Sequence, residues 1–275
     1  MPTLTKEELA SFLMDMGAYE VRVADPCRGF EHAVPERHPL ALFPDCRSVV
    51  VFIVPRTAWA NNTAVAVKDP GPYGATPDRL PLAHRLFHAS GWTTVSVIEL
   101  LRERIWFAGS NLLRACGCRV GEGYVQEKLC AYEAGMGVYG RSGLIIHPEL
   151  GNRFSPGVLL TDAAFESDQR IEGFDPCAGC HVCITACPAE AYQNGRQYPD
   201  NWSREACMAK RSQLAANGIY CHECFRACPT GMTNDGELLV VRNLRSFGDE
   251  FGSPEPETNL RSASEENVGI AAAGL

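Results

Sequence analysis

The residues of this 275-residue chain best suited to chemistry are its cysteines, of which there are 13. Eight of them form one block, which we call the cysteine block: Cys177, Cys180, Cys183, Cys187, Cys207, Cys221, Cys224 and Cys228. Thiolates are nucleophiles, redox groups and ligands of soft metals, and closely spaced C-x₂-C pairs are typical of metal sites. The spacing within the block therefore decides which role the sequence supports.

The first half of the block is a complete C-x₂-C-x₂-C-x₃-C-P motif that begins at Cys177 and ends at Pro188. This spacing is that of bacterial 4Fe–4S ferredoxins, and in two-cluster ferredoxins the fourth cysteine of such a run ligates the other cluster. The second half, which ends at Pro229, lacks only the counterpart of Cys177. Cys207 is the one cysteine between the two motifs.

The eight cysteines then divide into two sets of four with none left over. We predict one cluster held by Cys177, Cys180, Cys183 and Cys228, and a second held by Cys187, Cys207, Cys221 and Cys224. The alternative is a zinc ribbon, because C-x₂-C pairs also suit tetrahedral zinc. The two Cys-Pro motifs favour iron–sulfur.

Other candidate ligands carry weaker signals. His84 and His88 stand four residues apart on a predicted helix, but no third ligand lies near them in the sequence. Scattered cysteines are most often buried core thiols; here these are Cys27, Cys46, Cys116, Cys118 and Cys130. The Cys116-Gly117-Cys118 pair is the one we keep as a candidate redox or ligand site.

The segment 135-GMGVYG-140 matches G-x-G-x-x-G, the fingerprint of dinucleotide sites. That fingerprint needs a strand before it and a helix after it. Here a helical pattern precedes it and the apolar run 143-GLIIH-147 follows, so we do not expect a nicotinamide site. Two interpretations stay open: a glycine-rich helix end, or a backbone kept bare for the approach of a flat cofactor.

Local patterns predict the elements that must position these residues. We expect a helix capped at Thr5, a buried strand at 48–54, helices at 81–90, 94–115 and 125–134, a hairpin of 143–147 with 157–161, a loop at 60–80, a helix capped by Ser203, and a short element at 237–247. Helices and strands interleave up to about residue 166, as in an α/β or α+β layer domain. The cysteine block is too small for a core of its own, so we expect metal to hold it.

Composition limits the class of partner and the compartment. The net charge of −8 and the pI of about 5.4 argue against nucleic acid as a general electrostatic partner. No apolar run approaches the roughly 20 residues that span a bilayer, and the opening MPTLTKEEL lacks the basic and apolar regions of an export signal. We therefore expect a cytoplasmic protein without a membrane partner, whose thiols are ligands or core residues rather than disulfides.

An ordered series of motifs resembles a known family. The series runs from Glu127-Lys128 through the glycine segment and 157-GVLLTD-162 to the cysteine block. It resembles the epoxyqueuosine reductases and their relatives, the cobalamin-dependent reductive dehalogenases, in detail over about residues 121–230. The resemblance implies an α+β fold with a nitroreductase-like, cobalamin-binding-type α/β domain at 1–168 and a bacterial two-cluster ferredoxin-like domain at 169–235. A partly flexible C-terminal segment would follow at 236–275.

The resemblance also implies a reductase. An external donor of the ferredoxin or flavodoxin type would pass electrons through two 4Fe–4S clusters to a cobalamin and then to a bound substrate. Four residues would face the corrinoid: Gly137, Tyr139, Gly140 and Arg141. The family's general acid, an Asp a few residues before the Glu-Lys pair, is replaced by Gly121, and the family's longer C-terminal extension that helps hold tRNA is not among these residues. We therefore expect a different substrate; the alternative is a cofactor-free electron-transfer or accessory iron–sulfur protein that acts with a partner protein.

With Gly121 at the family's acid position, another group must deliver the proton that a reductive bond cleavage needs. The candidates are Glu122, Tyr124, Tyr139 and His147. Glu122 comes first because it lies between two glycines in a loop that can bend inward. His147 comes second because an unperturbed imidazole titrates near neutrality. The two tyrosines are equally well explained as half-buried aromatics.

Overall fold

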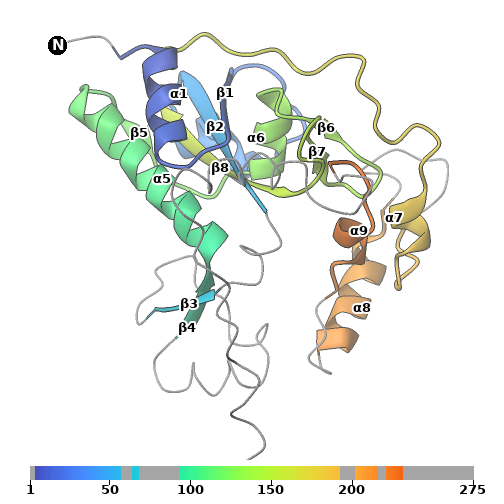
Figure 1. The fold of residues 1–275 in the computed structure, drawn as a ribbon. Helices are drawn as coiled ribbons and strands as arrows, with labels where there is room; N and C mark the ends of the chain where they lie inside the picture. The colour runs from blue at the N-terminus through green and yellow to red at the C-terminus, as the bar shows by residue number, and fades with distance from the viewer. Residues whose placement is uncertain (1–3, 57–63, 68–92, 193–201, 216–220, 232–275) are drawn as a thin grey trace, which may run out of the picture.

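A computed structural model describes residues 4–56, 64–67, 93–192, 202–215 and 221–231 (Figure 1). Its centre is a four-stranded antiparallel sheet in the order β1-β2-β8-β5. The strands are β1 (Glu20–Ala24), β2 (Ser48–Pro55), β8 (Phe154–Thr161) and the short β5 (Val120–Gly121). The predicted buried strand at 48–54 is confirmed, since every residue from Ser48 to Val54 is buried.

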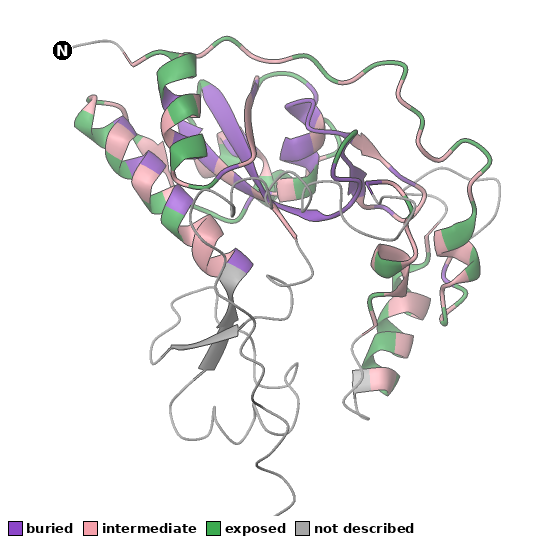
Figure 2. Cartoon of the chain, viewed as in Figure 1, coloured by how far each residue is buried: buried purple, intermediate pink, exposed green. Residues whose placement is uncertain are grey.

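Helices cover both faces of this sheet (Figure 1). On one face, α1 (Lys6–Asp15) and α5 (Val97–Ala115) pack their apolar side chains against Phe52 and Leu159. On the other face, α6 (Glu127–Glu133) packs against Val51 and Ile53. Successive side chains of a strand point to opposite faces, so β2 contributes to both cores. Figure 2 shows that buried residues concentrate in this sheet and in α6.

Two predicted helix ends are confirmed by their hydrogen bonds. The Thr5 side chain accepts a hydrogen bond from the Glu8 amide, and the Glu8 carboxylate accepts one from the Thr5 amide, which completes the capping box of α1. At the end of α6, Gly135 adopts a positive φ of 74° and Met136 N donates to Ala131 O at 2.9 Å. This is a Schellman ending, so the helix-end interpretation holds at Gly135.

The predicted hairpin of 143–147 with 157–161 is wrong. Within the first segment, β7 (Ile145–Ile146) pairs with β6 (Val138–Tyr139), while β8 pairs with β2 on one edge and β5 on the other. The bridge between His147 and Gly151 closes the chain on itself after β7. β8 pairs with β2 along its whole length and with β5 at Leu160 and Thr161, whereas Ile145 and Ile146 take their partners from β6.

Two further boundaries differ from the sequence expectation. Residues 93–96 form β4 (Thr93–Ser96), so the helix predicted from residue 94 begins at Val97. The strand that pairs with β4 is β3 (Ala64–Val67), which lies within the predicted loop at 60–80. The short elements η1 (Pro35–Arg37) and α2 (Pro39–Leu42) connect β1 to β2. The segments 81–90, with His84 and His88, and 237–247 lie outside the described residues.

The cysteine block carries three helices: α7 (Val182–Thr185), α8 (Arg204–Ala215) and α9 (Glu223–Arg226). Neither α7 nor α9 has a buried residue, and their surfaces are exposed or intermediate in Figure 2. The predicted cap of α8 is confirmed, because Ser203 Oγ accepts from Ala206 N at 3.2 Å. Across the described part of the chain, none of the helices combines the length and the apolar character that a membrane span requires.

Candidate metal centre and adjoining pocket

The structure brings together cysteines from the two halves of the block. The pKa of Cys183 is raised to about 11, first by burial and then by the charges of neighbouring thiols, Cys177 and Cys228 among them. The pKa of Cys177 is also raised, chiefly by burial, with Cys228 contributing. Cys228 therefore lies beside cysteines that precede it by more than 40 residues. These are its partners in the first predicted ligand set.

Cysteines of the second predicted set also lie close enough to influence one another's pKa. Burial is the main cause that raises the pKa of Cys207, and the charges of Cys224 and Cys187 act in the same direction. The three come from three different segments of the block. The assignment of clusters to these sets stays a prediction.

The chemistry of this donor set fits iron–sulfur clusters. All eight block cysteines are free thiols of intermediate exposure. In the described ranges, no group of three or more His, Cys, Asp or Glu side chains is arranged to hold a single metal ion. A 4Fe–4S cubane does not require several ligands around one ion, because each of its four thiolates binds a different iron.

The sheet domain supports the first half of the block through backbone and side-chain donors. Arg141 N donates to Cys177 Sγ at 3.4 Å, and Arg141 Nε donates to Cys177 O at 3.2 Å. Amide hydrogen bonds to ligating sulfur are one of the means by which a protein sets a cluster's potential. Arg141, predicted to face a corrinoid, therefore contacts the first cysteine of the block.

The second half of the block docks on the turn between β7 and β8. Arg153 donates to Cys228 O at 2.7 Å and to Thr230 O at 2.9 Å. Asn152 Nδ2 donates to Phe225 O at 3.2 Å. These bonds hold the segment that carries Cys228 against the sheet domain.

Gly137 and Gly140, which the resemblance places facing a corrinoid, have a packing role. A Cβ on Gly137 would lie 2.4 Å from Ile146 O, and one on Gly140 would lie 2.7 Å from Ile146 Cγ1. The chain itself thus fills the space that a bare backbone leaves at these two positions. The ring of Tyr139 lies 5.2 Å from that of Tyr132, as an ordinary aromatic pair does.

A pocket of about 240 Å³ lies between α5, the 121–125 loop and β8. One face of α5 contributes five of its lining residues at helical spacing: Glu99, Arg102, Glu103, Trp106 and Phe107. Glu122 and Tyr124 come from the loop, and Glu127 is the first residue of α6.

Arg102 organises the charges of this pocket. Its guanidinium donates to Glu99 at 2.8 Å and also to Glu127. Desolvation of the partly buried Glu127 carboxyl raises its pKa, although the charge of Arg102 acts in the opposite direction. Glu127 is therefore protonated up to a higher pH than an ordinary glutamate.

The predicted proton donor Glu122 does line this pocket, but it is exposed. Its side chain is 81% accessible, and its ion pair with Arg114 is long, at 3.8 Å. The neighbouring Gly121 has a local reason to be glycine, because a Cβ there would lie 2.6 Å from the Phe43 side chain. The aspartate that the family places at this position could not enter unless Phe43 moved.

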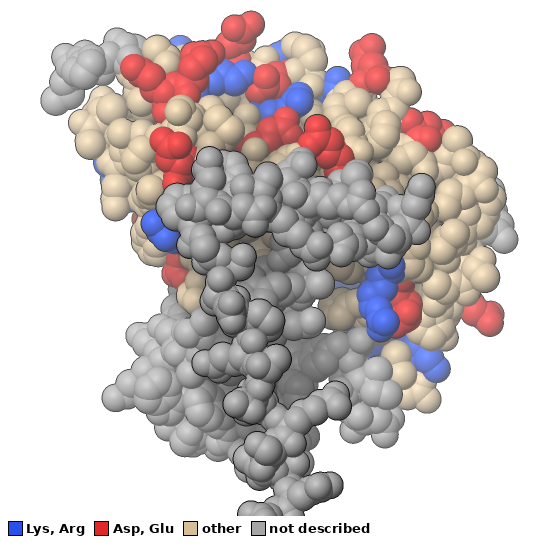
Figure 3. Space-filling view, in the orientation of Figure 1, with Lys and Arg blue, Asp and Glu red and all other residues tan. Residues whose placement is uncertain are grey.

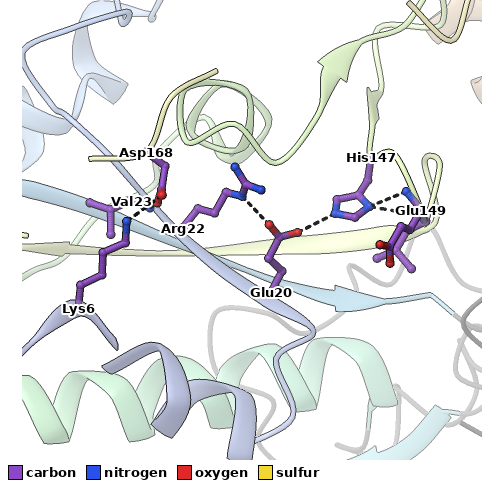
Figure 4. A network of polar contacts seen from close by, with 8 residues as sticks. Lys6, Glu20, Arg22, Val23, His147, Glu149 and Asp168 are labelled. Atoms are coloured by element: carbon purple, nitrogen blue, oxygen red, sulfur yellow. Dashed lines mark hydrogen bonds and ion pairs between the residues drawn. The ribbon is translucent and has the colours of Figure 1, made fainter. Parts of the chain in front are cut away.

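The second predicted proton donor, His147, is a structural residue (Figure 4). It is only 5% exposed, its Nε2 lies 2.7 Å from Glu20, and its Nδ1 accepts from the amides of Glu149 and Leu150. Burial alone would raise the pKa of Glu20, but hydrogen bonds from His147 and Arg22 together lower it. Glu20 belongs to β1 and Glu122 follows β5, the opposite edges of the sheet, so the two predicted donors do not meet.

The five cysteines outside the block are not among the residues that line the pocket. Cys46 and Cys130 are buried as expected, whereas Cys27 is exposed. Burial raises the pKa of Cys118, which disfavours a reactive thiolate in the Cys116–Cys118 pair. Sequence reasoning did not find the α5 face of the pocket; its signal is the recurrence of acidic and aromatic residues at helical spacing.

An antiparallel sheet with helices on both faces, joined to a segment with two interleaved cysteine motifs, defines a mixed α/β class of cysteine-rich protein. No family model matches the chain. The epoxyqueuosine reductase of Listeria monocytogenes is 24% identical over 90% of this chain and 74% of its own length. That of Staphylococcus aureus is 28% identical over 44% of this chain, which spans only 34% of the relative.

Solved structures show the same fold. An epoxyqueuosine reductase matches 85% of this chain with a TM-score of 0.54 and 20% identity. A reductive dehalogenase described as B12-dependent matches 88% of this chain and 33% of its own, with a TM-score of 0.59 and 18% identity. The predicted resemblance to epoxyqueuosine reductases and reductive dehalogenases is thus confirmed. The domain bounds at 168 and 235 stay predictions.

Proposed function

We propose that this chain is an iron–sulfur reductase that passes electrons through two 4Fe–4S clusters toward a substrate in the pocket beside α5. The observation that carries the proposal is the pairing of distant cysteines, Cys228 with Cys177 and Cys183, and Cys207 with Cys187 and Cys224. A two-cluster ferredoxin with interlocked ligands would bring the same cysteines together. The likeness to curated reductases supports the enzyme class.

The pocket and the second cluster site are neighbours through α6. Glu127 lines the pocket, and the next residue, Lys128, is close enough to Cys224 for the thiol's charge to act on its pKa. Desolvation of the ammonium lowers that pKa, and Cys224 opposes the shift. In this proposal α6 connects the second cluster site with the pocket.

The reaction class that fits this arrangement is reductive cleavage of a carbon–heteroatom bond. An external one-electron donor of the ferredoxin or flavodoxin type reduces each cluster once. The substrate R–X takes up two electrons and one proton, the R–X bond breaks, and R–H and X⁻ are released. Glu127 is placed to supply the proton, because its carboxyl lines the pocket and retains its proton to a raised pH.

A corrinoid is the electron acceptor that the resemblance implies. Neither the glycine segment nor the pocket beside α5 fits a corrinoid. The glycine segment is filled by Ile146 and borders Cys177, and the pocket of about 240 Å³ is smaller than the roughly 300–1,000 Å³ of drug-sized ligand sites. The proposed path therefore ends at the clusters and the pocket. A titration with cobalamin, followed by absorption spectroscopy, tests this: stoichiometric binding would restore the corrinoid to the path.

The alternative function, an electron-transfer or accessory iron–sulfur protein, is favoured by this same misfit. It predicts that the clusters are reduced by a donor and reoxidised only by a partner protein. Oxidation of the reduced protein by a small substrate, without any added protein, would exclude the alternative.

Iron and sulfide analysis of anaerobically purified protein tests the cluster assignment. We expect about eight irons per chain, because two cubanes hold four each. Cys207→Ala should lose one cluster, whereas the matched control Cys116→Ala, at a cysteine outside both sets, should retain both. One zinc per chain, or full iron content in Cys207→Ala, contradicts the assignment.

A further inference from the structure

We propose that the pocket beside α5 binds a small aromatic cation that also carries a hydrogen-bond acceptor. Only the statement that this cation is the substrate class rests on the proposed reductase function; the binding site itself does not. Three independent properties of the lining lead to this ligand class: its charge, its exposed rings and an unpaired donor.

The lining has an excess of negative charge. Four glutamates line it, at Glu99, Glu103, Glu122 and Glu127; of the cations near them, Arg102 lines the pocket too, and Arg56 lies 3.9 Å from Glu99. Arg102 is shared between two of the four, Glu99 and Glu127. Within the described chain Glu103 forms no ion pair, and the exposed pair of Glu122 with Arg114 is weak at 3.8 Å. Even with Glu127 protonated, the remaining carboxylates attract a cation and repel a carboxylate or phosphate.

Aromatic side chains stand at the same opening. Phe107 is 50% exposed and Tyr124 is 67% exposed, and both line the pocket. The indole N–H of Trp106 is already used, since it donates to Val158 O at 3.0 Å. The ring of Tyr124 already accepts a cation, because the Arg37 guanidinium lies 5.1 Å from its centroid. These rings suit stacking and cation–π contact with a flat cation.

The pocket also contains a donor without an acceptor. Arg102 Nε is buried and finds no hydrogen-bond partner in the part of the chain that the structure describes. A buried unpaired donor costs about 1–3 kcal/mol, and it belongs to a side chain that lines the pocket. The volume of about 240 Å³ limits the ligand to one or two rings.

The charges of the pocket lining favour a small ligand over a polyanion. On the face drawn in Figure 3, acidic side chains stand beside Lys and Arg, and the described residues form no broad basic surface there. A phosphate backbone would meet the glutamates of the pocket without a compensating basic patch. The proposed ligand is therefore a free small molecule.

A series of three pyridine probes tests the proposal: 1-methylnicotinamide, a cation with a carbonyl acceptor; nicotinamide, its neutral counterpart; and nicotinate, an anion. Binding to the anaerobic, cluster-loaded protein is measured by calorimetry and by quenching of tryptophan fluorescence. We expect the cation to bind about tenfold more tightly than the neutral probe, the size of one desolvated cation–π contact and a nearby carboxylate. Nicotinate should not bind measurably.

Variants separate the pocket from the general charge of the protein. Glu103→Gln and Phe107→Ala should each weaken binding of the cation several-fold, whereas the control Glu7→Gln, an exposed glutamate on α1, should not. Equal binding of cation and anion, or equal effects of Glu103→Gln and Glu7→Gln, overturns the site.

The same experiment distinguishes the site from the proposed function. Retained cation preference in Cys207→Ala supports the site even if the iron analysis has failed. Full iron content without cation preference overturns the site and leaves the cluster assignment intact.

Discussion

At the scale of single residues, the difference between His147 and Glu127 shows how surroundings decide a titratable group's role. Both ring nitrogens of His147 are engaged, with Glu20 on one side and two backbone amides on the other. A buried imidazole with both nitrogens engaged holds a turn and has no free position for a substrate proton. Glu127 lines a pocket and its pKa is raised by desolvation, so we propose it as the proton donor.

We expect Glu127→Gln to lower turnover by about 10²- to 10⁴-fold, the range for loss of a general acid. In the wild type, turnover should fall as pH rises through the raised pKa of Glu127, because the acid form is then lost. The residual activity of Glu127→Gln should not show this fall with rising pH. The measurement is reductant-driven turnover of a substrate that the wild type reduces, with both clusters shown intact by EPR.

Glu122→Gln is the matched control, since Glu122 lines the same pocket but is exposed. A greater loss in Glu122→Gln than in Glu127→Gln would return the acid role to Glu122.

At the scale of elements, the turn between β7 and β8 connects the sheet domain to the second half of the cysteine block. Gly151 has a positive φ of 59°, and a Cβ there would lie 1.8 Å from Thr230 O. Arg153 donates to Thr230 O and Cys228 O from the same turn. The position of Cys228 therefore depends on close backbone contact at Gly151.

Gly151→Ala should separate the turn from residues 228–231, lower the iron content and lower the melting temperature. Gly173→Ala is the matched control, because Gly173 has a similar φ of 71° but no neighbour within 4 Å of its Cβ position. The control should lose about 1 kcal/mol through left-handed backbone strain and keep its iron. Equal iron content in the two variants would show that this contact does not position Cys228.

What could be predicted at this scale was local in the sequence. The Thr5 cap, the apolar run of β2 and the glycine at the end of α6 each lie within a few residues of the bonds they make. The hairpin prediction failed because β8 pairs with β2 and β5, and the residues 157–161 do not indicate which distant strands they pair with. The cysteine sets that the spacing suggests stay a prediction. The pocket could not be predicted, because it unites an α5 face, a loop and a strand edge.

At the scale of the whole molecule, two parts differ in what stabilises them. The sheet has an apolar core on each face. The described part of the cysteine block has hardly any buried apolar side chains, with Ala191 the exception. We therefore expect the clusters to stabilise the block and the hydrophobic effect to stabilise the sheet.

Removal of iron by an anaerobic chelator should release amide protection in α7, α8 and α9 while β1, β2 and β8 stay protected. Hydrogen exchange followed by mass spectrometry measures this, and far-ultraviolet circular dichroism should keep most of its signal. Simultaneous loss of protection in the sheet and the block would instead mean that the two form one cooperative unit.

The neighbourhood of Cys228 and Cys177 also sets an order of events during synthesis. The chain leaves the ribosome from its N-terminus, so Cys177, Cys180 and Cys183 emerge before Cys228, the fourth ligand of their predicted cluster, has been added. Neither predicted cubane can gain its last protein ligand until the second motif has emerged, since Cys187 waits for Cys221 and Cys224 in the same way. Completion of either predicted cluster is thereby deferred until the second motif has been made, and an interrupted translation product that ends before residue 221 would carry no fully ligated cluster.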